Sequence, residues 1–350
     1  MNTPYRVTDL VSAMAELDPS GPVFADTETC GLYGKVRLLQ VYQEHLDAVL
    51  LVEWPNVYEL MNELGKFNTV WHNSHYDITT MQQTSGTRWI PTEFQDTLYL
   101  ARLAFPEKEK FSLDEVMLYS LGYDPYTKQG LDKKKLQKTN WAAPVLTPEQ
   151  LLYAATDVYY MPAVWQHASV ELLNPSYKLD MLTLRRCLEF QWNGMPVDSD
   201  RLVALFDKNK AEIEGYAMPI NVNSWQQVRP YIGENESDGL ALATFALQGN
   251  ERAGNVRTVR KLIKQNSFLK KFETNADGRI YGKFLPSARS GRLTSKDQNL
   301  QQLPRSTKGV FGYPEGSDRV LIYADYAQVE LRTICAITTC LRMEELFRKG

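Results

Sequence analysis

Two acidic residues, Asp26 and Glu28, stand at the end of an apolar run that begins at Val23. In a β-strand, residues i and i+2 project from the same face, so these two carboxylates would lie side by side. Two neighbouring carboxylates repel each other unless a cation lies between them, which makes the pair a candidate for binding a hard divalent metal. The same pattern is common in solvated turns, so the prediction depends on further ligands elsewhere in the chain.

Two more acids stand where such ligands are needed. Asp77 follows the stretch 68–73, where a short strand is expected to pass into a helix, and site residues often lie at such junctions. Asp157 lies in a helix whose start is marked at Thr147–Gln150 by a capping Thr, a Pro and a Gln. Four carboxylates without His or Cys ligands favour Mg²⁺ or Mn²⁺. Tyr153, one turn before Asp157 on the same helix face, could hold a water beside that acid or be an ordinary core aromatic.

The elements that must position these acids can be read from hydrophobic spacing. Strands are expected at 38–42 and 48–52, forming a meander with the acidic strand, and a helix at 57–67. A helix is expected to run from 74 to 83, and another to begin at 94–98. Asp96 is equally plausible as the N-cap of that last helix and as a site residue.

The motifs Asp26-x-Glu28, Asn73-x-x-Tyr76-Asp77 and Tyr153-x-x-x-Asp157 occur in this order. Together they resemble the three motifs of the DEDD-type 3′–5′ exonucleases, in the subclass with a tyrosine in the third motif. The resemblance implies an α/β, RNase H-like domain over residues 1–175, a mixed sheet flanked by helices. It also implies that Asp26, Glu28, Asp77 and Asp157 hold two Mg²⁺ or Mn²⁺ ions, and that Tyr153 orients the attacking water.

The composition is that of a globular chain. Its 350 residues, 43% hydrophobic and 23% charged, suffice for two or three domains. The start of the chain has no signal-peptide apolar core, and we expect no membrane span. The four cysteines show no C-x-x-C pairing, which favours a reducing compartment. We therefore expect a cytoplasmic protein, and the family resemblance implies a bacterial or phage-infected cell.

Charge is distributed unevenly along the chain. Residues 1–100 contain thirteen acidic and five basic residues, whereas residues 251–310 contain fourteen basic and four acidic ones. A basic block of this kind indicates a polyanionic partner, most simply nucleic acid, although part of it could be the solvated face of a helix.

The second half of the chain is mainly helical in pattern. Helical spacing runs over 180–215 with a turn at 193–198, and further helical stretches are expected at 241–246 and 256–272. A turn into a strand follows at 277–282. The stretch Arg319–Tyr326 is expected to be a buried strand that ends in Asp325 and passes into a helix beginning at Ala327.

Two segments of this half resemble family A (Pol I-like) DNA polymerases. Ser290-Gly291-Arg292-Leu293 with Asp297-x-Asn299-Leu300-Gln301 is similar to the segment that grips the primer-template minor groove, and 325–332 is similar to palm motif A. The resemblance implies a helical thumb over 176–275 and an incomplete palm over 276–350. It implies that Asp325 is a metal-binding palm aspartate and that Glu330 selects the sugar. The implied DNA contacts are Arg289, Arg292, Asn299, Gln301 and Gln302.

The favoured interpretation is a proofreading 3′–5′ exonuclease acting on DNA, joined to the front of a family A DNA polymerase used in replication. Its partners would be a single-stranded DNA 3′ end and primer-template DNA. The fingers and the second palm aspartate have no counterpart in the sequence, so we expect a second polypeptide or a missing C-terminal half to complete the polymerase. Until then the chain should excise nucleotides but not add them. The alternatives are a stand-alone RNase D-like exoribonuclease and an inactive nucleic-acid-binding module.

Overall fold

The computed structural model describes residues 3–272, 276–286, 288 and 290–349. The chain divides into two compact units, one formed by residues 1–194 with 281–302 and the other by residues 195–280 with 303–350. Two hydrophobic clusters lie in the first unit and one in the second. The boundaries of the three domains expected from the sequence stay a prediction.

The first unit is built on a six-stranded mixed sheet of order β1-β4-β3-β2-β5-β6. The central strands β2, β3 and β4 are antiparallel, whereas β1 pairs with β4, β2 with β5, and β5 with β6 in parallel. The expected mixed sheet is therefore confirmed. The strands are β1 (Tyr5–Thr8), β2 (Val23–Thr29), β3 (Val36–Tyr42), β4 (Val49–Glu53), β5 (Thr69–Trp71) and β6 (Phe94–Asp96).

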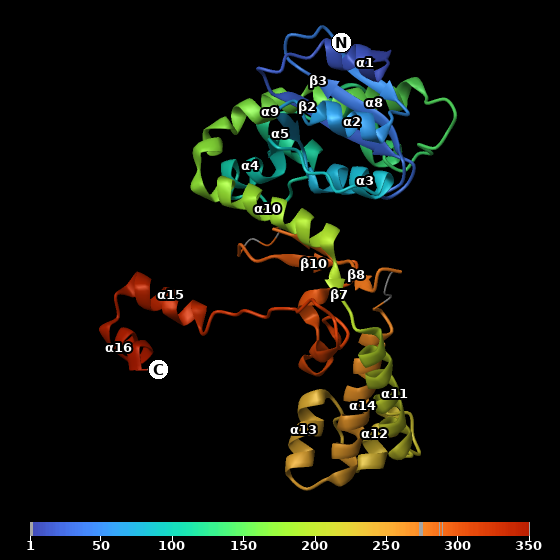
Figure 1. Ribbon diagram of the computed structural model, residues 1–350, viewed down its shortest axis with the longest axis vertical. Coiled ribbons are helices and arrows are strands. Elements are labelled where there is room, and N and C mark those ends of the chain that lie inside the picture. The colour runs from blue at the N-terminus through green and yellow to red at the C-terminus, as the bar shows by residue number, and fades with distance from the viewer. Residues whose placement is uncertain (1–2, 273–275, 287, 289, 350) are drawn as a thin grey trace. The chain divides into compact units, whose positions relative to one another are not determined.

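Helices cover both faces of this sheet, and every residue of its strand β3 is buried. One apolar cluster includes side chains of α1, α2, α3 and α10, and the other includes side chains of α5, α8 and α9. Figure 1 shows α8 lying across the strands. The helices are α1 (Leu10–Ala15), α2 (Val57–Leu64), α3 (His75–Ser85), α4 (Thr97–Ala104), α5 (Leu113–Leu121), α6 (Pro125–Lys128), α7 (Lys133–Leu136), α8 (Pro148–Tyr159), α9 (Met161–His167), η1 (Ser169–Leu173) and α10 (Pro175–Asn193).

A hairpin from much later in the chain belongs to the same unit. It consists of β9 (Lys283–Leu285), β10 (Thr294–Lys296) and the short helix η2 (Leu300–Gln302). Phe284 meets Phe190 of α10 edge to face with ring centroids 6.5 Å apart. Arg102 of α4 donates to the carbonyl oxygen of Pro286 over 3.0 Å. The hairpin is thus fastened to α10 and α4 (Figure 1).

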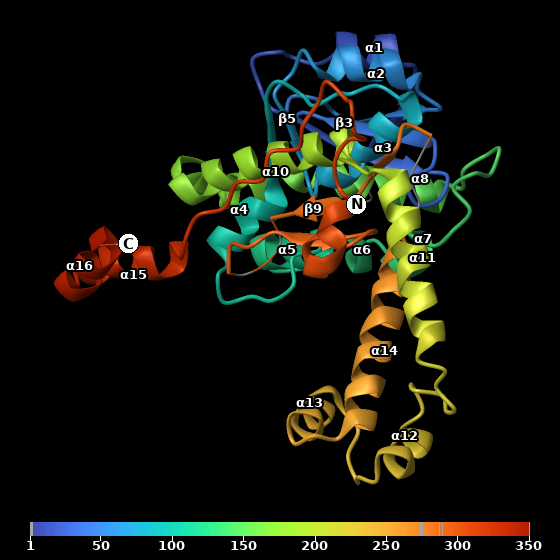
Figure 2. The ribbon, with the colours of Figure 1, turned by 60° about the horizontal axis from the view of Figure 1, so that its bottom comes forward.

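The second unit is mostly helical, as expected. Its long helices α11 and α14 run side by side (Figure 2), and a buried amide pair links them, Asn209 Nδ2 donating to Asn266 Oδ1 over 2.9 Å. The strands β7 (Met195–Pro196) and β8 (Arg279–Ile280) pair antiparallel, which confirms the turn into a strand expected at 277–282. The helices are α11 (Ser199–Gly215), α12 (Trp225–Ile232), α13 (Gly239–Leu247), α14 (Glu251–Leu269), η3 (Arg305–Val310), α15 (Val329–Thr338) and α16 (Leu341–Lys349).

Two sequence-based expectations are wrong. Residues 94–96 form the edge strand β6 before α4 begins at Thr97, because their backbone pairs with β5. The stretch Arg319–Tyr326 is not a buried strand: Val320 and Ile322 are 79% and 83% exposed, and within the described residues its backbone joins no sheet. A strand requires a hydrogen-bonded neighbour, and the described part of the chain places none beside this stretch.

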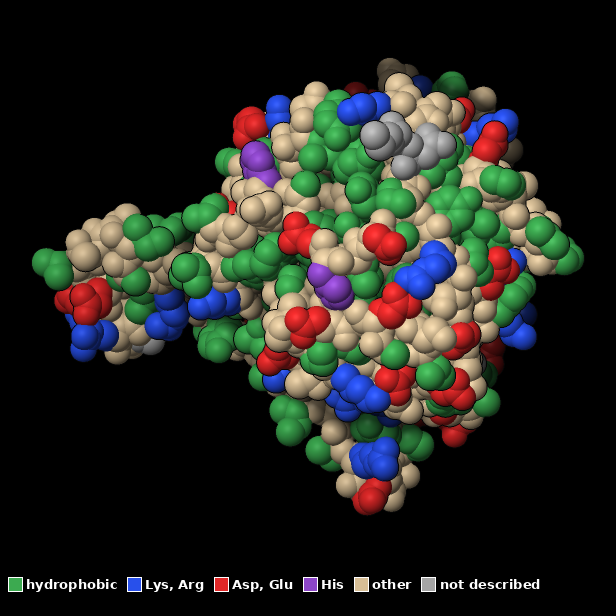
Figure 3. Space-filling model, turned by 90° about the horizontal axis from the view of Figure 1, so that it is seen from above, with side chains coloured by type: hydrophobic (Ala, Val, Ile, Leu, Met, Phe, Trp, Pro, Cys, Tyr) green, Lys and Arg blue, Asp and Glu red, His purple; other side chains and the backbone are tan. Residues whose placement is uncertain are grey.

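On the face seen in Figure 3, acidic side chains lie among basic and polar ones. Among the described residues, no helix combines the length and the apolar character needed to cross a membrane.

Candidate active site

The strand β2 presents Asp26 and Glu28 on one face of the sheet. The pairing register places Asp26 opposite Gln40 of β3, and Glu28 opposite Leu38. A register shift follows between Glu28 and Thr29, and Gly31 then takes a φ of +83°, a conformation that a residue without Cβ adopts freely. The strand therefore ends just past the two acids, and both side chains stay partly buried.

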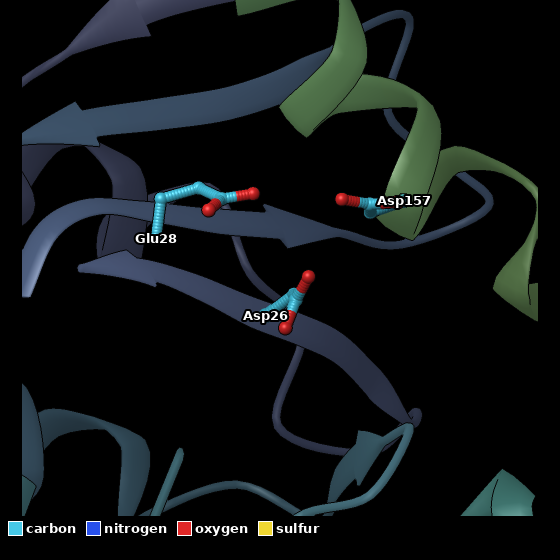
Figure 4. Close-up of side chains that lie close together, drawn as sticks. All are labelled: Asp26, Glu28 and Asp157. Carbon is cyan, nitrogen blue, oxygen red and sulfur yellow. The ribbon is translucent and has the colours of Figure 1, made fainter. Parts of the chain in front are cut away.

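The helix α8 brings Asp157 over the same face. Its start is the capping box expected from the sequence: the Gln150 backbone N–H donates to Thr147 Oγ1 over 3.2 Å, and the Thr147 N–H donates to Gln150 Oε1 over 2.9 Å. Carboxylate oxygens of Asp26, Glu28 and Asp157 all lie within 4.8 Å of one another. Figure 4 shows the three side chains converging from β2 and α8. The structure thus brings together three of the four predicted acids.

The fourth acid, Asp77, lies beside this group but outside it. It is buried in the first turn of α3, and its Oδ1 accepts a hydrogen bond of 2.6 Å from Thr27 Oγ1. Thr27 stands between the two acids of β2, so Asp77 is held against the strand that carries them. Its negative charge is close enough to raise the pKa of both Asp26 and Glu28.

The turn that leads to Asp77 is held by Asp96. Asn73 adopts a φ of +65°, and its backbone N–H donates to Asp96 Oδ1 over 3.0 Å. The Ser74 N–H and Oγ both donate to Asp96 Oδ2 over 2.7 Å, and the Leu98 N–H donates to Oδ1 over 2.9 Å. Asp96 is therefore the N-cap of α4 and also the acceptor that fixes the β5–α3 turn. It lies away from the cluster of three acids.

Burial and mutual repulsion disfavour the charged forms of the acids at this site. Burial raises the pKa of Asp77 to about 7 and that of Asp157 to about 6. Burial, followed by the charges of the neighbouring acids, raises the pKa of Asp26 and of Glu28 well above the usual range. Lys133 acts in the opposite direction on Glu28 and Asp157. One lysine cannot neutralise four carboxylates, so further positive charge would stabilise their ionised forms.

The side chains around the acids form a cavity of about 350 Å³. Tyr153 lines it and is 3% exposed, so the expected face of α8 is confirmed. Two further groups at the cavity were given no role from the sequence, although the run 131–141 that contains Lys133 is typical of the exonuclease superfamily that the motifs resemble. Lys133 lines the cavity with its Nζ 2.7 Å from Asp114 Oδ1, and the Tyr126 hydroxyl donates to Asp157 Oδ1. Both come from short helices between the motifs, where no periodic pattern marks a residue as facing the site.

The donors present fit a hard divalent cation. The converging atoms are all carboxylate oxygens, the ligands that Mg²⁺ and Mn²⁺ prefer. Gln40, directly opposite Asp26, is fully buried, and its side-chain amide has no hydrogen-bond partner among the described residues. A buried amide of this kind calls for a water or an ion shell beside it.

The raised pKa values of the four acids predict an unusual dependence of the free energy of unfolding on pH when no metal is bound. Since the folded-state pKa values are raised, the folded chain retains protons that the unfolded chain has lost, so the free energy of unfolding should fall as pH rises. His72 and His75, whose pKa burial lowers to about 4, oppose this below pH 6.5. We therefore expect the melting temperature in EDTA to fall as pH rises above about 6.5, where the two histidines no longer oppose the fall, and Mg²⁺ to remove most of it. Scanning calorimetry checks this; a flat profile in EDTA would contradict it.

The residues expected to contact DNA lie in or beside the hairpin of the first unit. Arg292, Gln301 and Gln302 are exposed and Asn299 is partly buried, whereas Arg289 lies outside the described residues. Gln301 Nε2 donates to the Leu293 carbonyl over 3.1 Å, and the Gln301 N–H donates to Asn299 Oδ1 over 3.1 Å.

The two expected palm residues lie in the second unit. Asp325 is exposed in the unpaired stretch, and Glu330 is exposed in the first turn of α15. Their roles stay predictions.

Comparisons with known proteins agree with both halves of this description. The family model described as 3′–5′ exonuclease matches residues 2–172, and the model described as DNA polymerase family A matches residues 207–350. DNA polymerase I of Aquifex aeolicus is 26% identical over 385 residues, covering 97% of this chain and 64% of that protein. DNA polymerase I of Streptococcus pneumoniae is 35% identical over 82 residues, 21% of this chain and 9% of that protein.

A solved structure shares the fold. The polymerase domain of Pol1 from M. smegmatis, in complex with DNA primer-template and dNTP, superposes with a TM-score of 0.71 at 18% identity. The match covers 99% of this chain and 65% of that one, so the chain spans about two thirds of the length of these two relatives. Residues 2–172 therefore form a 3′–5′ exonuclease domain, and residues 207–350 form part of a family A DNA polymerase domain.

Proposed function

We propose that the chain is a metal-dependent 3′–5′ exonuclease that removes nucleotides from the 3′ end of DNA, as the proofreading part of a replicative polymerase. The observation that carries the proposal is the convergence of Asp26, Glu28 and Asp157 within 4.8 Å, beside a cavity lined by Tyr153 and Lys133. We place this activity in the cytoplasm of a bacterial or phage-infected cell.

Asp26, Glu28, Asp77 and Asp157 would hold two Mg²⁺ or Mn²⁺ ions. When bound, such a pair supplies activation of a water and stabilisation of the leaving 3′ oxygen in an in-line displacement at phosphorus. Asp77 would have to turn from Thr27 toward the other acids, since its Oδ1 is otherwise engaged. The pKa values above normal mean that the acids bind the ions in competition with protons.

The other cavity residues would bind and orient the substrate. Tyr153 lies one turn before Asp157, where its hydroxyl can hold the attacking water in line with the phosphate; its high pKa makes it a positioning group, not a base. Lys133 is held by Asp114 with its Nζ at the cavity, where it can approach a phosphate oxygen.

DNA is the proposed substrate because the exonuclease domain is joined to part of a DNA polymerase domain in one chain. A 5′-labelled single strand, offered as DNA and as RNA of the same sequence with Mg²⁺, tests this. We expect stepwise shortening of the DNA from its 3′ end, faster than that of the RNA, and none in EDTA. Faster degradation of RNA would favour an RNase D-like exoribonuclease, and binding without degradation would favour an inactive module.

For the polymerase part, we propose that Arg289, Arg292, Asn299, Gln301 and Gln302 contact primer-template DNA. We also propose that Asp325 is a palm metal ligand and that Glu330 selects the sugar. The exposed apolar stretch Arg319–Tyr326 supports a further proposal, that strands from another polypeptide segment pair with it.

Extension of a primed template with Mg²⁺ and dNTPs is the assay for this last proposal. We expect the 350-residue chain alone to shorten the primer and not to extend it, because Asp325 is exposed and its stretch pairs with no strand among the described residues. Extension by the purified chain alone would contradict the proposal. Extension that appears only when a polypeptide carrying the remaining palm strands is added would support it.

A further inference from the structure

Tyr126 is buried against the proposed active site, although it belongs to none of the motifs that predicted it. Its side chain is 1% exposed, and its hydroxyl donates a hydrogen bond to Asp157 Oδ1. The residue is the second of the four-residue helix α6, whose N-cap Asp124 accepts the Tyr126 backbone N–H over 3.0 Å. A short capped helix thus fixes the backbone from which the hydroxyl reaches Asp157.

The ring of Tyr126 contacts two other groups that line the cavity. Its centroid lies 5.7 Å from that of Tyr153, with the rings inclined at 33°. Lys133 Nζ, which forms an ion pair with Asp114, lies 5.0 Å from the centroid of the Tyr126 ring. One buried side chain therefore touches the acid from α8, the tyrosine one turn before it, and the lysine at the cavity.

We propose that Tyr126 is a positioning residue for the metal site: its hydroxyl holds one oxygen of Asp157 and so fixes the orientation in which this carboxylate would bind a cation. This deepens the proposed function and rests on it. A carboxylate with both oxygens unengaged can rotate or bind side-on, whereas one held by a neutral donor has a fixed orientation. Groups that hydrogen-bond to metal ligands in this way typically change metal affinity by about 10–100-fold when removed.

The competing explanation is that Tyr126 only fills the core. Its ring belongs to the apolar cluster that includes Phe24 and Val158, so loss of the whole side chain would destabilise the fold whatever the hydroxyl does. The variant Tyr126→Phe separates the two explanations, because it keeps the ring and its contacts with Tyr153 and Lys133 and removes only the hydroxyl.

The test is Mn²⁺ binding to the full chain, followed by the electron paramagnetic resonance signal of free Mn²⁺. We expect Tyr126→Phe to bind Mn²⁺ about tenfold more weakly than the parent chain. The matched control is Tyr42→Phe, a buried tyrosine of the same cluster whose ring packs on Tyr159 instead of the acids; its Mn²⁺ affinity should equal that of the parent. In exonuclease assays, added Mg²⁺ should restore much of the activity of Tyr126→Phe, with KM for DNA unchanged.

The outcomes are distinguishable. Equal Mn²⁺ affinity of Tyr126→Phe and parent overturns the positioning role while the proposed function stands. If the parent chain binds no Mn²⁺, the proposed function fails and the inference fails with it. A change in the stability of the metal-free Tyr126→Phe chain is separated from a change in metal binding by comparing melting temperatures with and without Mn²⁺. The rise in melting temperature that saturating Mn²⁺ produces should be smaller for Tyr126→Phe than for the parent and Tyr42→Phe.

Discussion

Replacing Asp26 with asparagine is expected to slow the removal of 3′ nucleotides by about a thousandfold. Asp26 is the acid whose pKa responds to all three of its acidic neighbours, so it lies at the centre of the charges that a cation would balance. Loss of about 4 kcal/mol of transition-state stabilisation corresponds to about 10³ in rate. The measurement is the rate of shortening of a labelled DNA strand at saturating Mg²⁺.

The matched control is Asp47→Asn, which makes the same chemical change at an exposed position of the β3–β4 turn and should leave the rate unchanged. Asp26→Asn should also retain DNA binding, because it removes a negative charge from the site. A variant that kept a tenth or more of the parental rate would show that the acid cluster is not where the reaction occurs.

Asp96→Ala is expected to lower the free energy of unfolding by at least about 3 kcal/mol. Four donors from Asn73, Ser74 and Leu98 converge on this fully buried carboxylate, and the substitution would leave them without an acceptor. The turn before α3 would loosen, and Asp77 with it, so exonuclease activity should fall as well. Urea unfolding followed by circular dichroism measures the change.

The control for Asp96→Ala is Asp9→Ala. Asp9 is also an N-cap acceptor, of α1, but it is exposed, and it accepts a hydrogen bond from the backbone N–H of Ser12. Its loss should cost about 1 kcal/mol, as is usual for an N-cap. Similar values for the two variants would show that Asp96 is only a helix cap and that the β5–α3 turn is held by other contacts.

Much of the first unit could be predicted because its signals are local. The spacing of Asp26 and Glu28 places both on one strand face, and the Thr-Pro-x-Gln pattern at 147–150 marks the start of α8 to the residue. These patterns depend on backbone geometry and capping alone, so they can be recognised without knowledge of the fold. The convergence of β2 and α8, by contrast, was supplied by the family resemblance.

The misses have a common cause in tertiary context. β6 has only three residues, too few for an alternation to be seen, and its strand character comes from pairing with β5. Tyr126 and Lys133 face the acids because of where α6 and α7 pack, which no periodicity encodes. Arg319–Tyr326 has the hydrophobic pattern of a strand. A strand forms only when it pairs with a neighbouring strand, and the pattern of one segment does not reveal whether such a neighbour is present.

The first unit is discontinuous along the chain, and this affects how it can form during synthesis. Residues 1–194 leave the ribosome well before residues 281–302, which supply the hairpin on α10. At about 5–20 residues per second the delay is roughly 5–20 s, far longer than the time in which a helix forms. Throughout that interval the hairpin does not yet cover the side of α10 that carries Phe190. This apolar surface can bind chaperones or lead to aggregation until the later segment is synthesised and packs on it.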